Sequence, residues 1–169
     1  MLAVGHALHV VIITRRTRHA EPAHPLLRQE AHPIQRPTLG EHGEGKPLLP
    51  AVELARTFGA QLHVLAVVRE IEAILQAKSA PLGYEVILAD LENRVAALIR
   101  RVNASDLKPN ILVTHGASIY AEILGVAEKA EADLVVIGSH RPAMKDYLLG
   151  TDAARVVRHA RCSVLVARE

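Results

Sequence analysis

Short apolar runs alternate with amphipathic stripes along the chain from residue 46 onward. Apolar side chains that recur at steps of three and four predict a helix with one buried face, whereas an uninterrupted apolar run predicts a strand covered on both faces. The predicted helices span Lys46 to Phe58, Glu85 to Val102, Ser118 to Ala130 and Thr151 to Ala160. The predicted strands span Gln61 to Val68, Ile111 to Thr114, Leu134 to Ile137 and Ser163 to Ala167. Ser118 is placed to cap the start of its helix, and Gly59 to end the first one.

This alternation of helix and strand predicts an α/β fold, an open doubly wound parallel sheet of the Rossmann-like type with about five strands. The composition agrees, because a chain of 169 residues that is 50% hydrophobic can bury the core of one domain. The chain holds no Trp and only one Phe, so aliphatic side chains must make up most of that core. Such a core suits helices stacked on a buried parallel sheet better than an aromatic-rich β sandwich.

Residues 1–40 are compositionally different, and between Arg15 and Gly45 the residues follow neither the helical nor the strand period. Pro22, Pro25, Pro33 and Pro37 would interrupt either element, so we expect a loop or disorder here. The expected organisation is therefore an atypical amino-terminal segment, residues 1–40, followed by one domain over residues 41–169. The histidines of this segment lack the close spacing of metal ligands, so we expect no metal site.

Charge and composition exclude several classes of partner. The formal net charge is +2, and both signs are interspersed, so no field favours nucleic acid or an acidic membrane. The scarcity of aromatic residues also argues against single-strand binding. The lone Cys162 excludes an intramolecular disulfide framework and fits a reducing compartment. No apolar run is long enough to cross a membrane, and Val10 to Ile13 is too short for a signal-peptide core. We therefore expect a cytoplasmic protein.

The loop between Gly138 and Gly150 is the most informative candidate site. It leaves one predicted strand and enters a predicted helix, and ligands of open parallel sheets bind where strand ends and helix starts meet. Both glycines would let the backbone approach a ligand, and the amides and hydroxyl at Thr151 suit a phosphate. Alternatively, the glycines serve only a turn and Thr151 is the N-cap. The carboxylate of Asp152 would repel a phosphate.

Three segments in the last quarter of the chain closely resemble the carboxyl-terminal signature of the universal stress protein family. They are Ala132 to Pro142, Tyr147 to Thr151 and Val156 to Val166. A weaker resemblance covers Lys46 to Val68 and Gly116 to Ala130, so that in all it spans roughly residues 40–169. The resemblance implies an adenine-nucleotide α-hydrolase-like fold and a stress-response or signalling module that binds ATP, with Mg as an accompanying ion, and forms a homodimer.

The phosphate loop departs from the family pattern at the middle glycine and in the spacing after it, where eight residues instead of nine precede Gly150. Nucleotide-binding members carry Gly, two residues, Gly, nine residues, then Gly and Ser or Thr. Gly138 matches the first glycine and Gly150 with Thr151 the last pair, but Arg141 replaces the middle glycine. Ser-His-Arg-Pro followed by Tyr-Leu-Leu-Gly resembles a subgroup of small proteins in which ATP binding is also expected, with Arg141 as a phosphate contact. The alternative for Arg141 is a solvated loop charge.

The resemblance implies a nucleotide site with phosphate and nucleoside ends. Its residues are Val67, Val68, Gly116, Gly138, Ser139, His140, Arg141, Gly150, Thr151 and Asp152. No catalytic base is evident, so we expect at most slow ATP hydrolysis or autophosphorylation. A competing function is a dimeric scaffold or signalling partner without nucleotide. An adenylating enzyme is less favoured, because no glycine- and serine-rich loop follows a first strand.

The first and the last strand along the chain raise separate questions. The family begins with an apolar strand and a Pro-x-Asp-like turn, whereas the matching place here, His32 to Leu39, holds prolines and no Asp. Either His9 to Thr14 supplies the first strand with a long insertion after it, or the strand is missing, or residues 1–39 come from a reading-frame slip or misplaced start. The sharp change in composition favours the last hypothesis. At the other end, Ser163 to Ala167 would be an apolar edge that two copies could cover.

Overall fold

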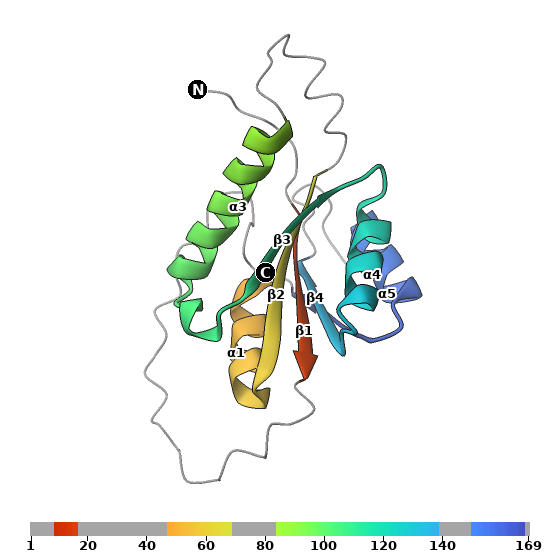
Figure 1. Cartoon of the computed structure of the whole chain (residues 1–169). Coiled ribbons are helices and arrows are strands. Elements are labelled where there is room, and N and C mark those ends of the chain that lie inside the picture. The colour runs from red at the N-terminus through yellow and green to blue at the C-terminus, as the bar shows by residue number, and fades with distance from the viewer. Residues whose placement is uncertain (1–8, 17–46, 69–83, 139–149, 168–169) are drawn as a thin grey trace.

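A five-stranded sheet with helices on both faces forms the protein (Figure 1). The computed structural model describes residues 9–16, 47–68, 84–138 and 150–167. In chain order the elements are β1 (His9–Arg16), α1 (Leu48–Phe58), β2 (Ala60–Val68), α3 (Tyr84–Arg101), the 3-10 helix η1 (Ser105–Leu107), β3 (Asn110–His115), α4 (Ile119–Lys129), β4 (Leu134–Gly138), α5 (Thr151–His159) and β5 (Ser163–Ala167). The strand order is β3-β2-β1-β4-β5. The predicted α/β, doubly wound class is confirmed.

Strand β1 lies in the middle of the sheet and runs against all the others. It pairs antiparallel with β2 and with β4, whereas β2 with β3 and β4 with β5 are parallel pairs. The expectation of an entirely parallel sheet is therefore wrong at this strand. Residues 17–46 separate β1 from α1, and a connection of that length does not force the parallel pairing that a short crossover would. Antiparallel pairing is also slightly more stable per residue.

Of the three alternatives for the first strand, the structure has the first, a strand beginning at His9. Its far end is tied to β4, because the Thr14 hydroxyl donates to the Leu134 carbonyl at 3.4 Å and the Asp133 amide donates to the Thr14 carbonyl at 3.3 Å. The strand lies inside the atypical segment 1–40, and its last two residues, Arg15 and Arg16, fall in the stretch expected to be irregular. The rest of that segment lies outside the described residues, so the proposed boundary near residue 40 stays a prediction.

Strand β2 divides the core into two hydrophobic layers. Its residues Leu62, Val64 and Ala66 pack with α1 and α3 on one face of the sheet, and Leu65 and Val67 pack with α4 and α5 on the other. Successive side chains of a strand point to opposite faces, so a continuous apolar run is what a strand covered on both faces requires. All five of these side chains are fully buried. None of the helices in the described ranges has the length and apolar character that crossing a membrane requires.

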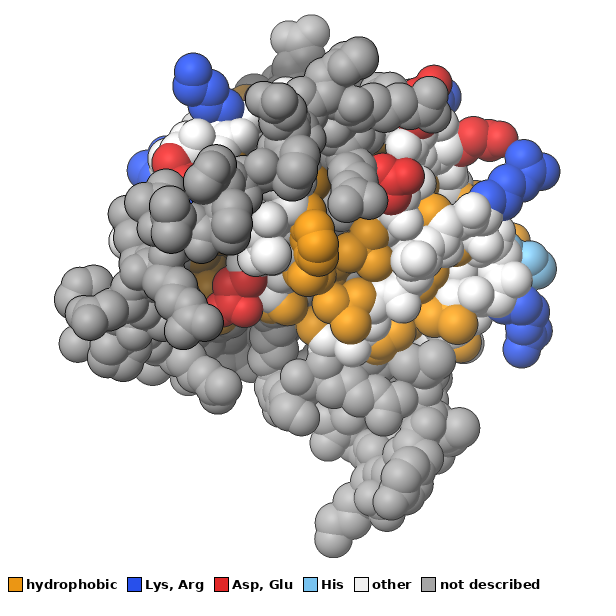
Figure 2. Space-filling model, turned by 90° about the horizontal axis from the view of Figure 1, so that it is seen from below, with side chains coloured by type: hydrophobic (Ala, Val, Ile, Leu, Met, Phe, Trp, Pro, Cys, Tyr) orange, Lys and Arg blue, Asp and Glu red, His pale blue; other side chains and the backbone are white. Residues whose placement is uncertain are grey.

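The starts of β2–β5 define one end of the sheet, which we call the amino edge; their last residues define the carboxyl edge. At the amino edge, α1 ends as predicted at Gly59, whose φ of 57° is left-handed. Seen from this end, hydrophobic side chains gather on the surface (Figure 2). Leu54, Phe58 and Leu134 help to line a pocket of about 210 Å³ there.

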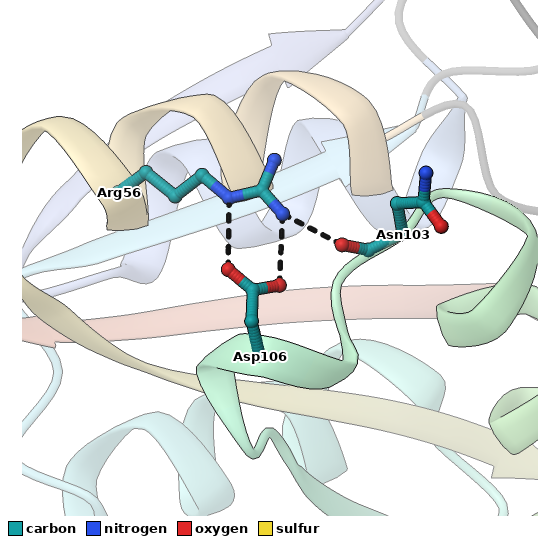
Figure 3. Close-up of polar contacts among 3 residues, drawn as sticks. All are labelled: Arg56, Asn103 and Asp106. Carbon is teal, nitrogen blue, oxygen red and sulfur yellow. Dashed lines mark hydrogen bonds and ion pairs between the residues drawn. The ribbon is translucent and has the colours of Figure 1, made fainter.

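Arg56 joins the end of α1 to the turn before β3 at the amino edge (Figure 3). Its guanidinium donates to both carboxylate oxygens of Asp106, at 3.2 and 2.8 Å, and to the Asn103 carbonyl at 2.6 Å. Hydrogen bonding from Arg56 lowers the pKa of Asp106. Both side chains are about half exposed, so we expect this bidentate pair to stabilise the fold modestly.

Candidate functional site

Three helices begin at the carboxyl edge of the sheet. Helix α4 follows the end of β3, and α5 runs back from this edge because it leads to Ser163, which pairs with the first residue of β4. Helix α1 starts beside the end of β4, since a Cβ atom on Gly138 would lie 3.3 Å from Cδ of Pro47. Within the described residues, none of the three N-cap residues, Pro47, Ser118 and Gly150, makes a side-chain capping hydrogen bond. Helix starts carry unsatisfied N–H groups and a partial positive charge, so this edge favours an anion.

The phosphate end of the predicted site is built around the start of α5. Gly150 occupies the N-cap position. Thr151 is the first residue of the helix, and its side chain is exposed. The alternative that Thr151 is itself the N-cap is therefore wrong, because the helix begins one residue earlier than that role requires. Asp152 lies half-buried in the first turn. Gly138 ends β4 and pairs with Ala167 of β5.

The loop residues Ser139, His140 and Arg141 lie outside the described residues. The structure therefore brings Gly138, Gly150, Thr151 and Asp152 to one edge, and the contribution of Arg141 stays a prediction.

The nucleoside end of the predicted site lies where β2 and β3 finish. Val67 and Val68 are buried, and the Gly116 amide donates to the Val68 carbonyl at 3.1 Å. The structure thus brings these three residues together. His9 pairs with Val67, so the start of β1, and not its end, borders this region. That reversal follows directly from the antiparallel direction of β1.

Sequence reasoning missed a carboxylate beside Gly116. The Thr114 hydroxyl donates to Oε2 of Glu122 at 2.9 Å. A Cβ atom on Gly116 would lie only 2.5 Å from Oε1 of the same residue, so glycine is needed for this close approach. Glu122 lies in the first turn of α4, and an acidic residue in the first turn after a predicted strand was the signal that could have found it. The carboxylate can accept hydrogen bonds from hydroxyl groups of a ligand.

Ser118 occupies the N-cap position of α4, as predicted, but it does not cap the helix. Its hydroxyl oxygen is buried and has no hydrogen-bond partner in the part of the chain that the structure describes. The expected capping bond is therefore wrong. Without a Ser118 cap, the start of α4 keeps the partial positive charge of a helix start, which adds to the positive character of the carboxyl edge.

A doubly wound α/β domain whose helix starts gather at the carboxyl edge of its sheet belongs to the class of folds that bind ligands there. The family model of the universal stress protein family matches residues 38–168, and the chain belongs to this family. Membership places it among proteins of the stress response. The finer assignment to the subgroup with the Ser-His-Arg-Pro loop stays a prediction.

Individual relatives agree with this assignment over parts of the chain. The chain is 47% identical over 51 residues to universal stress protein G of Shigella flexneri, an overlap of 30% of this chain and 36% of that protein. It is similar to the crystal structure of the hypothetical protein PH0823, with a TM-score of 0.50 and 19% identity over 62% of this chain and 73% of that one.

A universal stress protein from Archaeoglobus fulgidus gives a TM-score of 0.49 at 19% identity, over 72% of this chain and 82% of that one. The chain spans about a third of the length of the curated relative it matches. At 19% identity the likeness to PH0823 shows the fold alone.

Proposed function

We propose that the chain is an ATP-binding module of the stress response, acting in signalling in the cytoplasm. The observation that carries the proposal is the convergence of three helix starts without side-chain caps at one edge of the sheet. A triphosphate supplies the negative charge and the hydrogen-bond acceptors that such helix starts lack. The family assignment supports the same conclusion.

Each end of the nucleotide has matching groups along this edge. The phosphates lie on the backbone amides after Gly150 and on the Thr151 hydroxyl, with Gly138 and the predicted loop residues Ser139, His140 and Arg141 beside them. Asp152 supplies a carboxylate oxygen of the kind that an accompanying Mg ion binds. The nucleoside lies against Val67, Val68 and Gly116, and the Glu122 carboxylate suits the hydroxyl groups of a ribose.

The experiment is to measure the nucleotide released when purified protein is denatured. Gly150→Asp is the test variant, because aspartate is a good N-cap and preserves α5 while its carboxylate repels phosphate. Gly125→Asp is the matched control, since nothing lies within 4 Å of a Cβ atom there. We expect ATP from the parent and the control and about tenfold less from Gly150→Asp. Equal ATP from both variants would overturn the proposed phosphate site.

A dimeric scaffold without nucleotide is the second candidate. Two observations favour it: β1 begins at the nucleoside end where a strand would be expected to finish, and β5 is an edge strand on which Leu165 is 38% exposed. An open apolar edge is stabilised when a second copy covers it. Absence of nucleotide from the parent protein, together with a dimer in solution, would support this candidate.

The dimer is tested at Leu165, whose substitution does not disturb the core. Leu165→Lys should convert the dimer to a monomer, because a lysine on the strand edge opposes pairing. Val157→Lys is the control, since Val157 is 44% exposed but lies on α5. Light scattering reports the mass. A dimer that survives Leu165→Lys would show that β5 is not the interface.

A further inference from the structure

The carboxylate of Glu122 is held in position by the end of β3. Its Oε2 atom accepts a hydrogen bond from the Thr114 hydroxyl at 2.9 Å. Its Oε1 atom lies over Gly116, where a Cβ atom would come within 2.5 Å of it. A carboxylate that is already oriented in this way loses little further side-chain freedom when it binds a ligand, so less binding free energy is spent on ordering it.

The same carboxylate has capacity for further hydrogen bonds. An ionised carboxylate offers about four acceptor positions, and the Thr114 hydroxyl occupies one of them. In the described part of the chain no basic side chain forms an ion pair with Glu122, whereas Glu128 on the same helix is paired with Arg161. The Glu122 side chain is only half-buried. It can therefore accept from a ligand that donates hydrogen bonds.

Helix α5 packs beside α4, which fixes how far Glu122 lies from the proposed phosphate site. Ile123 of α4 and Val156 of α5 belong to one hydrophobic cluster, and the Arg155 guanidinium carbon lies 5.1 Å from the centre of the Tyr120 ring. The axes of packed helices are about 8–10 Å apart. Both helices begin at the carboxyl edge, and Glu122 lies in the first turn of α4. About one helix spacing therefore separates its carboxylate from the start of α5.

This separation selects the part of the nucleotide that Glu122 contacts. With the phosphates on the amides after Gly150, the triphosphate and the 5′ carbon of ATP span the gap between the two helix starts and bring the ribose to Glu122. The amino group of adenine lies on the far side of the base and would extend beyond it. The ribose presents two neighbouring hydroxyls that donate, and a carboxylate can accept from both. An acidic side chain binds a ribose hydroxyl in this way in other doubly wound domains.

We propose that Glu122 makes the carboxyl edge selective for ribonucleotides over 2′-deoxyribonucleotides, by accepting hydrogen bonds from both hydroxyls of the ribose. Thr114 and Gly116 are positioning residues, because one orients the carboxylate and the other leaves it room. The selectivity rests on the proposed function, since it requires the phosphates at the start of α5. The helix starts alone cannot supply it, because the two kinds of nucleotide carry the same phosphates.

The test compares the affinities of the full chain for ATP and 2′-deoxy-ATP by isothermal titration calorimetry, after bound nucleotide has been removed. The parent should bind ATP about tenfold more tightly, because the deoxynucleotide loses one hydrogen bond to a charged acceptor. Glu122→Ala should bring this ratio to about one, since the acceptor is gone. Glu128→Ala is the matched control on the exposed part of α4 and should leave the ratio unchanged.

The positioning residues are tested with the same ratio, which a change in stability alone would not move. Gly116→Ala should lower it, because the methyl group displaces the carboxylate, and Gly125→Ala should not. Should Glu122→Ala not fold, 2′,3′-dideoxy-ATP should bind the parent about a hundredfold more weakly than ATP. Equal affinities of the parent for ATP and its deoxy forms, or a ratio that survives Glu122→Ala, would overturn the selectivity and leave the proposed function intact. A parent that binds none of these nucleotides would overturn both.

Discussion

The amino edge and the carboxyl edge of the sheet differ in how their backbone polar groups are satisfied. At the amino edge, the Gly59 amide donates to carbonyls in the last turn of α1, the Lys108 amide donates to Ser105, and Arg56 binds both Asp106 and Asn103. At the carboxyl edge, α1, α4 and α5 all begin without a side-chain cap. The amino edge satisfies its own polar groups, while the carboxyl edge leaves helix starts that a ligand can satisfy. We therefore assign stability to the first and binding to the second.

The largest effect is expected from Leu62→Ala, which should lower stability at the amino edge without removing ATP binding at the carboxyl edge. Leu62 is fully buried near the amino edge, and truncation of a buried leucine lowers the free energy of unfolding by about 2–5 kcal/mol. Phe58→Ala is the control, because Phe58 is apolar but 53% exposed. Chemical denaturation gives the stability, and released ATP per folded protein gives the binding. A loss of ATP from protein that is still folded would contradict the division of roles.

A smaller effect is expected at the carboxyl edge from Gly116→Ala. The new methyl group would displace the Glu122 carboxylate and break its bond with Thr114, which should lower the free energy of unfolding by about 1 kcal/mol. Gly125→Ala is the matched control, because alanine is the better helix former by about 1 kcal/mol and the site is open. The two variants should shift the denaturation midpoint in opposite directions. Shifts of the same sign would argue against the tight contact at Gly116.

The smallest effect is expected from Asp106→Asn, which should lower the free energy of unfolding by about 0.5 kcal/mol at neutral pH, because both side chains of the ion pair are about half exposed. Arg56 lowers the folded-state pKa of Asp106. Its contribution is therefore present above the unfolded-state pKa and lost as pH falls through the folded-state value. Denaturation midpoints of parent and variant should converge in acid. Glu128→Gln, in a more exposed pair, should show a smaller difference, and a gap that widens in acid would contradict the assignment.

The hydrophobic period was sufficient to predict strands β2–β5 and the four α-helices of the described residues, because burial on one face or on both faces is visible in the sequence. It did not predict the 3-10 helix η1. Strand direction leaves no such record, so the antiparallel pairing of β1 was not predictable from its apolar run. The carboxyl-edge position of Gly138 and Gly150 followed from topology. The contact between Glu122 and Gly116 depends on tertiary approach of two segments, which a one-dimensional pattern does not contain.

The central, reversed β1 also has a consequence for the order of assembly during synthesis. Thr14 contacts Leu134, which lies 120 positions later in the chain. Strand β1 thus cannot complete its pairing until β4 has left the ribosome, and such distant contacts form slowly. In the interval β1, even when it is paired with β2, exposes the edge that β4 will later cover. We therefore expect nascent chains to depend on holding chaperones. Chaperone binding should be stronger for ribosome-bound chains truncated before β4 than for chains truncated after it.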